Sequence, residues 1–167
     1  MEIINKDQLR NLILNGITTE GLKAYDYSNI THMYNMLVDC TSLTSIPELD
    51  TSNVVDMSFM FFGCKSLTSI PKLDTSNVLD MGSMFEDCRS LTSIPELDTS
   101  NVTDMSSMFE DCRSLTSIPE LDTSNVVDMS AMFYSCTSLE HCFYDSRINY
   151  NEINSLKLKE NCPEFFI

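Results

Sequence analysis

The segment CRSLTSIPELDTSNVTDMSSMFED occupies residues 88–111 and is one of four nearly identical copies that follow one another along the chain. Each copy has 24 residues, and together they fill residues 40–135. The copies start at Cys40, Cys64, Cys88 and Cys112. A weaker copy precedes them at 26–40, and a fifth begins at Cys136 and then loses the pattern. A tandem repeat of this period is typical of a solenoid, in which each copy forms one coil.

The composition restricts the class of protein. The chain has 167 residues and 43% apolar residues, which is enough for one domain with a sizeable core. Its formal charge of −15 argues against direct binding to nucleic acids and to anionic membranes. We recognise no secretion signal and no apolar run of membrane-spanning length, so we expect a cytoplasmic protein.

The pattern within one copy predicts its secondary structure. Met105, Met108, Phe109 and Cys112 lie at the i, i+3, i+4, i+7 spacing of one helix face. The S-x-x-E spacing of a capping box, present in two copies, supports a helix start there. The stretch LTSI, which ends before a proline, predicts a short strand. We therefore expect an α/β repeat solenoid of about six coils, each with a short strand and a short helix.

Three regions are expected along the chain. Residues 1–24 would form an N-terminal capping helix and a first degenerate coil, with Asn5 or Asp7 as N-cap and Gly16 as C-cap. Residues 25–139 would form the repeat array, and residues 140–167 a C-terminal cap. We call residues at the same position in successive copies a column. The Asp-Thr-Ser-Asn columns have a structural interpretation, because these side chains satisfy backbone groups at turns and stacked asparagines can bond a neighbouring coil.

The unit LDTSNVTDMSSMFEDCRSLTSIPEL, with its N-V-x-x-M segment, M-F-x-x-C segment and L-x-x-I segment, resembles the repeat of the BspA-type leucine-rich repeat family. The resemblance covers about residues 25–140 and recurs in register. It implies a curved, leucine-rich-repeat-like solenoid with a binding role and no catalytic residue. Known members are largely bacterial surface proteins of adhesive or uncharacterised role, with related repeats in protists and phages.

The pattern of the seven cysteines indicates residues that pack in the core rather than metal ligands or catalytic residues. Five of them recur every 24 residues on the expected core side, where buried and reduced thiols are the ordinary outcome. No C-x-x-C spacing points to zinc, although a disulfide among Cys136, Cys142 and Cys162 stays open. The aspartate columns could suggest calcium, but the glycine-rich turns of calcium-binding solenoids are missing. His32 and His141 have no orienting third group, so neither an enzyme nor a cofactor is expected.

Differences between the copies predict the binding surface. Seven of the 24 positions vary, and most of these lie on the expected helix side facing away from the core. Aromatic side chains at otherwise polar positions are typical anchors of a protein interface. An alternative is that Phe59 and Phe62 pack under a cap or loop. The candidate partner-binding residues are Phe59, Phe62, Glu86, Asp87, Arg89, Glu110, Asp111, Arg113 and Tyr134.

The sequence thus favours a non-enzymatic module that binds a protein partner, whose identity it does not reveal. One alternative is an acidic inhibitor or nucleic-acid mimic from a phage or mobile element. The copy at 88–111 carries five acids and one arginine, a linear charge density comparable with that of duplex DNA. The other alternative is a fragment of an adhesin-like surface protein. No metal, direct nucleic-acid or membrane binding is expected, and the oligomeric state stays open.

Overall fold

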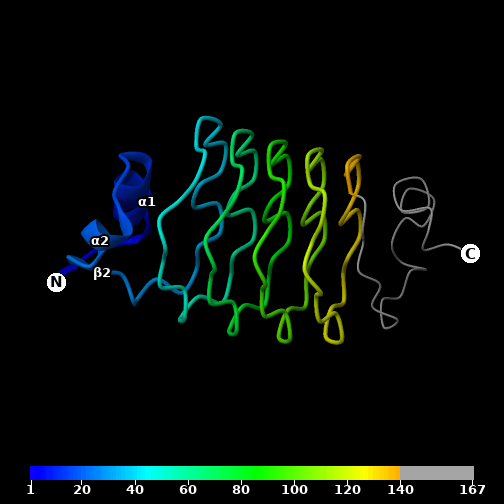
Figure 1. Ribbon diagram of the computed structural model, residues 1–167. Helices are drawn as coiled ribbons and strands as arrows, with labels where there is room; N and C mark the ends of the chain where they lie inside the picture. The colour runs from blue at the N-terminus through cyan, green and yellow to red at the C-terminus, as the bar shows by residue number, and fades with distance from the viewer. Residues whose placement is uncertain (140–167) are drawn as a thin grey trace, which may run out of the picture.

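The computed structural model describes residues 1–139, which form a helical N-terminal segment followed by a row of similar coils lying side by side (Figure 1). One hydrophobic cluster extends through the whole described part, from Ile4 to Leu139. The expected C-terminal cap at 140–167, together with His141, Cys142 and Cys162, lies outside the described residues.

The N-terminal segment contains four short elements. They are β1 (Glu2–Ile3), α1 (Lys6–Leu14), α2 (Thr19–Leu22) and β2 (Tyr25–Asp26), and β1 pairs with β2 in parallel. The predicted N-terminal helix is confirmed as α1. Asn5 is its N-cap and forms a capping box with Gln8, so the amides of these two residues at the helix start are satisfied. The helix ends at Leu14 with Asn15 as its C-cap, so the expectation of Gly16 as C-cap is wrong. Gly16 follows with a φ of +78°, which glycine adopts without strain.

Helix α1 covers the open end of the first coil. Leu9 and Ile13 are buried beneath it. The Arg10 guanidinium donates a 2.6 Å hydrogen bond to the carbonyl of Met36, and the Lys6 ammonium lies 3.8 Å from the centre of the Tyr34 ring. These contacts cap the core where no preceding coil can cover it.

Adjacent coils are joined by backbone hydrogen bonds between residues 23 or 24 positions apart in the chain. In the M-x-x-M-F segment every second amide donates to the next coil: Phe59 to Gly82 at 2.9 Å, and Phe61 to Met84 at 2.9 Å. The intervening amides close turns within their own coil, such as Met60 to Met57 at 3.1 Å. The parallel bridges that join Asp56, Asp80, Asp104 and Asp128 belong to the same stack.

The expected short helix and short strand are not formed as regular elements in residues 27–139. The M-x-x-M-F segment is instead a chain of overlapping turns, because Phe59 and Gly63 have φ values of +55° and +71° that no α-helix accommodates. Ser83, which the sequence suggested as a helix cap, also has a positive φ. In the LTSI segment only one amide per coil bonds its neighbour, as Thr68 does to Thr44 at 3.2 Å.

The Asp-Thr-Ser-Asn turn has the structural role expected for it. In the copy at 50–53, an Asp50 carboxylate oxygen accepts from the amide and the hydroxyl of Ser52, at 3.1 and 2.7 Å. The Thr51 hydroxyl donates to the Asp74 carbonyl of the next coil at 2.8 Å, and the Asn53 amide group donates to Ser28 of the preceding coil at 3.0 Å. Each turn is therefore bonded to both of its neighbours.

The core consists of columns of identical side chains. Phe61, Phe85, Phe109 and Phe133 form a continuous stack with ring centres 5.5–5.6 Å apart and ring planes within 4° of parallel. Such small angles mean that the rings of neighbouring coils have almost the same tilt. Each copy therefore buries its apolar residues against their own equivalents, which a single copy could not do.

Candidate partner-binding surface

The variable positions lie on the overlapping turns, and these positions differ in exposure. Phe59 is 41% exposed, and Phe62, Glu86, Asp87, Glu110, Asp111 and Tyr134 are half-buried. Arg89 and Arg113 are exposed. Four of the variable positions in each copy were expected on a helix side facing away from the core, and this is wrong for Gly63, Gly82 and Ser83, which are buried. Their equivalents in the neighbouring coils crowd these positions.

Phe59 and Phe62 form an aromatic pair on this surface. Their ring centres are 6.0 Å apart with planes tilted by 50°, an arrangement that aromatic rings favour. The alternative that Phe59 packs under a cap or loop is wrong, given its exposure. Tyr34, on the preceding coil, is 46% exposed. The sequence comparison missed Tyr34, because it lies in the degenerate first copy, outside the four that define the columns.

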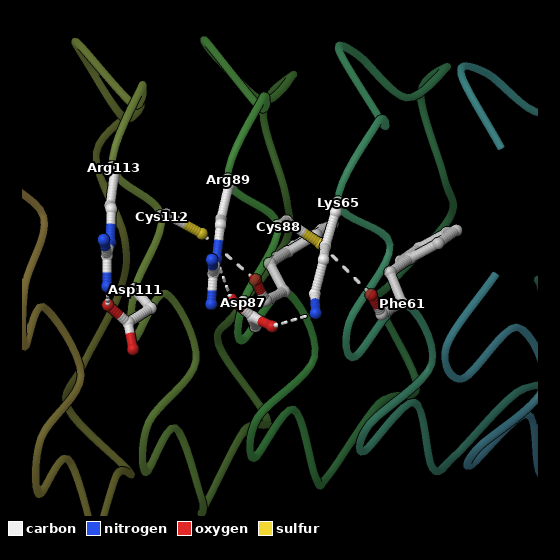
Figure 2. A network of polar contacts seen from close by, with 9 residues as sticks. Phe61, Lys65, Asp87, Cys88, Arg89, Asp111, Cys112 and Arg113 are labelled. Atoms are coloured by element: carbon white, nitrogen blue, oxygen red, sulfur yellow. Dashed lines mark hydrogen bonds and ion pairs between the residues drawn. The ribbon is translucent and has the colours of Figure 1, made fainter. Parts of the chain in front are cut away.

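Charged residues form a row beside this pair. Figure 2 shows Lys65, Arg89 and Arg113 on successive coils, with Asp87 between the first two. The Asp87 carboxylate lies 3.4 Å from the Lys65 ammonium and 2.5 Å from the Arg89 guanidinium, and Asp111 pairs with Arg113 at 2.9 Å. Partly exposed pairs of this kind contribute little to stability, but they hold the charges in a set order along the stack.

Glu86 and Glu110 occupy one column between Phe62 and Tyr134. Burial raises the pKa of Glu86, a hydrogen bond from Ser83 opposes this, and the negative charge of Glu110 raises it further. The Ser107 hydroxyl donates to Glu110 at 2.7 Å. The column thus presents an aromatic ring, two acids and a second aromatic ring on four successive coils.

The five cysteines that recur every 24 residues lie on the core side of the coils. Cys64, Cys88, Cys112 and Cys136 are fully buried, and Cys40 is partly exposed. Each buried thiol donates to a carbonyl of the preceding coil, as Cys88 does to Phe61 at 3.1 Å (Figure 2). Burial raises the pKa of Cys64 and of Cys136 to about 12, and raises the pKa of Cys88 and Cys112 further. Thiols held protonated in this way are poor nucleophiles and poor metal ligands.

Other groups that could carry chemistry are dispersed. Within residues 1–139 no group of three or more histidine, cysteine or acidic side chains is arranged to hold a metal ion. His32 is exposed, and its Nδ1 lies 2.9 Å from the hydroxyl of Thr31. Asp56, Asp104 and Asp128 each accept from the amide two residues later, which gives the aspartate column a role in turns.

Comparisons with known proteins give one match. The family model described as "Mycoplasma protein of unknown function, DUF285" matches residues 8–93 and 65–158. No curated protein and no solved structure matches the chain. In the described part, no helix has the length and apolar character needed to span a bilayer.

Proposed function

This chain belongs to the DUF285 family, a repeat family related to BspA-like surface proteins, and we propose that it is a non-enzymatic module that binds a protein partner. As part of the same proposal, we assign its repeats to the leucine-rich-repeat-like solenoids of the BspA type. The 24-residue register of the hydrogen bonds between coils supports this assignment.

The observation that carries the binding proposal is the conformation and exposure of Phe59. Its φ of +55° is unfavourable for a bulky side chain, at a cost of roughly 1 kcal/mol or more. Its ring is also left 41% exposed to water. The equivalent positions in other copies hold smaller residues with the same backbone conformation, namely Asn35, Ser83, Ser107 and Ala131. Folding therefore does not require a phenylalanine at position 59, whereas an interface does.

The surroundings of Phe59 suit an interface. Phe62 supports its ring, and Tyr34 is an exposed aromatic residue on the preceding coil. The ordered charges of Lys65, Asp87 and Arg89 lie in the next two copies of the repeat and would orient a partner. An aromatic centre with a charged rim is the usual composition of such sites. The LTSI columns, by contrast, offer the same short hydroxyls in every copy and would distinguish partners poorly.

Affinity capture from the native organism tests this proposal. The test variant is Phe59→Ser with Phe62→Glu, which gives this coil the residues that the copy at 88–111 holds at Ser107 and Glu110. We expect the fold to persist and the affinity for the captured partner to fall about 30-fold or more, as for loss of about 2 kcal/mol. The measurement is isothermal titration of the purified partner against both proteins.

The matched control is Thr68→Val with Thr92→Val, which alters exposed hydroxyls of the LTSI columns on the neighbouring coils. We expect this control to bind like the original protein. A control variant that loses affinity while the phenylalanine variant keeps it would assign binding to the LTSI surface and overturn the proposal.

A further inference from the structure

A groove lies along the Pro-Glu-Leu-Asp columns, which the aromatic surface does not use. Its central part has a volume of about 790 Å³ and is lined by three successive coils. Two further hollows continue it, because one shares residues 48–50 with the central part and the other shares residues 96–98. The groove therefore extends over five coils, from Asp26 to Asp122.

The groove carries an uncompensated negative charge. Its central part contains five carboxylates and one ammonium group, a net charge of −4. These groups are Glu48, Asp50, Asp74, Glu96, Asp98 and Lys72. None of them forms an ion pair within the described part of the chain. Acids that line a concave surface focus their field into it and attract cations.

The backbone in the groove has unused donors. The amides of Lys72, Asp74, Glu96 and Asp98 make no hydrogen bond with any described residue. A proline precedes each Glu/Lys-Leu-Asp segment, which keeps the backbone extended and prevents a regular ladder between coils.

The copy at 40–63 shows what these amides bind. There, the amide of Glu48 donates to the Thr19 hydroxyl at 3.1 Å, and the amide of Asp50 donates to the Tyr27 hydroxyl at 3.2 Å. Both hydroxyls line the N-terminal hollow of the groove. The N-terminal segment thus supplies acceptor oxygens to the same amide positions that the next two coils leave open.

We propose that the groove binds an extended, lysine- or arginine-rich peptide segment of a partner protein. The carbonyl oxygens of the peptide accept from the unbonded amides of the groove, as the hydroxyls of Thr19 and Tyr27 do in the copy at 40–63. The cationic side chains of the peptide pair with the carboxylates. Four coil steps of about 4.8 Å correspond to roughly six residues of extended chain. This inference goes beyond the proposed function, since it concerns a different surface and a partner of defined charge.

Titration with an end-capped hexapeptide of alternating lysine and alanine at low salt tests the inference. Lys72→Glu restores the glutamate of the other three copies and should strengthen binding about threefold. Glu96→Lys should weaken binding about tenfold. Asp7→Lys makes the same charge change on α1, at an exposed position outside the groove, and should leave the affinity within about twofold. Equal losses for the variants at 96 and 7 would overturn the proposal.

A second arm separates peptide recognition from simple charge attraction. Spermine carries several positive charges but no backbone carbonyls. The peptide should shift the amide resonances of Lys72, Asp74, Glu96 and Asp98 in an NMR titration, and spermine should not. Spermine that binds as tightly as the peptide, with the same amide shifts, would also overturn the proposal. The Phe59→Ser, Phe62→Glu variant should bind the peptide normally, so the two functional proposals fail or succeed separately.

Discussion

At the scale of the residue, each coil depends on two positions with a left-handed backbone. In the copy at 40–63 these are Phe59 and Gly63, and their equivalents in the other copies are Asn, Ser, Ala or Asp. The chain has only four glycines, so most of these positions are held by residues with a side chain. Hydrogen bonds on both sides of each turn supply the free energy that holds them in this conformation.

Gly82 lies outside these left-handed positions, and replacing it should stabilise the protein. The equivalents Ser58 and Ser106 donate their hydroxyls to Asp56 and Asp104 at 2.7 and 2.6 Å, whereas Asp80 receives only the amide of Gly82. Gly82→Ser restores the hydroxyl and reduces the entropy of the unfolded chain. We expect the free energy of unfolding, measured in urea, to rise by about 0.5–1 kcal/mol. The added hydroxyl should also lower the pKa of Asp80, which burial now raises.

Gly63→Ser provides the matched control, with the opposite expected sign. Gly63 has a φ of +71°, and a Cβ there would overlap the carboxylate of Asp39 on the preceding coil. This variant should lose stability in the same urea experiment. A Gly82→Ser variant that is destabilised to a similar extent would contradict the interpretation of Gly82 as a missing hydroxyl.

At the scale of the element, the column of cysteines links stability to pH. Cys64, Cys88, Cys112 and Cys136 have folded-state pKa values well above those of the unfolded chain, because burial disfavours the thiolate. Above pH 9 the unfolded state releases these protons while the folded state keeps them. Stability is therefore fully present below pH 9 and falls as the pH rises toward 12, by up to roughly 1.4 kcal/mol per pH unit for each thiol.

Urea midpoints measured between pH 8 and pH 10.5 test this linkage. Cys88→Ala should remove about a quarter of the loss of stability per pH unit that the four buried thiols cause. Labelling with a thiol reagent at pH 8 should leave these four cysteines unmodified in the folded protein and modify all of them in urea. Rapid labelling of Cys88 or Cys112 in the folded state would show that the column is accessible.

The elements also show how far sequence reasoning reaches. The apolar columns, the Asp-Thr-Ser-Asn turns and α1 with its Asn5 cap were predicted, because each follows from side-chain chemistry repeated in register. The short helix was wrong, since the spacing of Met105, Met108 and Phe109 also suits overlapping turns. Overlapping turns differ from a helix in that every second amide donates to the next coil. The sequence of a single copy does not contain that information. The comparison of copies did not predict the groove, because the residues that line it are nearly invariant between copies. Its unbonded amides are backbone groups, which a comparison of side chains does not detect.

At the scale of the whole molecule, the repetition of the same contacts between successive coils predicts tolerance to removal of a complete copy. Deleting residues 88–111 joins Asp87 to Cys112 in the original register and preserves every type of contact between coils. We expect a folded protein that unfolds cooperatively in urea, with a smaller m-value and a smaller heat-capacity change, because less surface is buried. Circular dichroism and calorimetry provide the measurements.

Deletion of only residues 88–99 serves as the control, since it places unlike columns against one another. That variant should lose the cooperative transition. A half-copy deletion that is as stable as the full-copy deletion would show that register does not hold the stack together.

The parallel planes of the phenylalanine stack have a consequence for how such a protein diversifies. Because the rings of successive coils are stacked with almost parallel planes, an added copy extends the stack, and every surface column lengthens with it. Copy number then sets the span of ligand that one molecule can cover, while single substitutions at the variable positions set its selectivity. Reach and selectivity can therefore evolve independently, the first by duplicating 24 residues and the second by changing one.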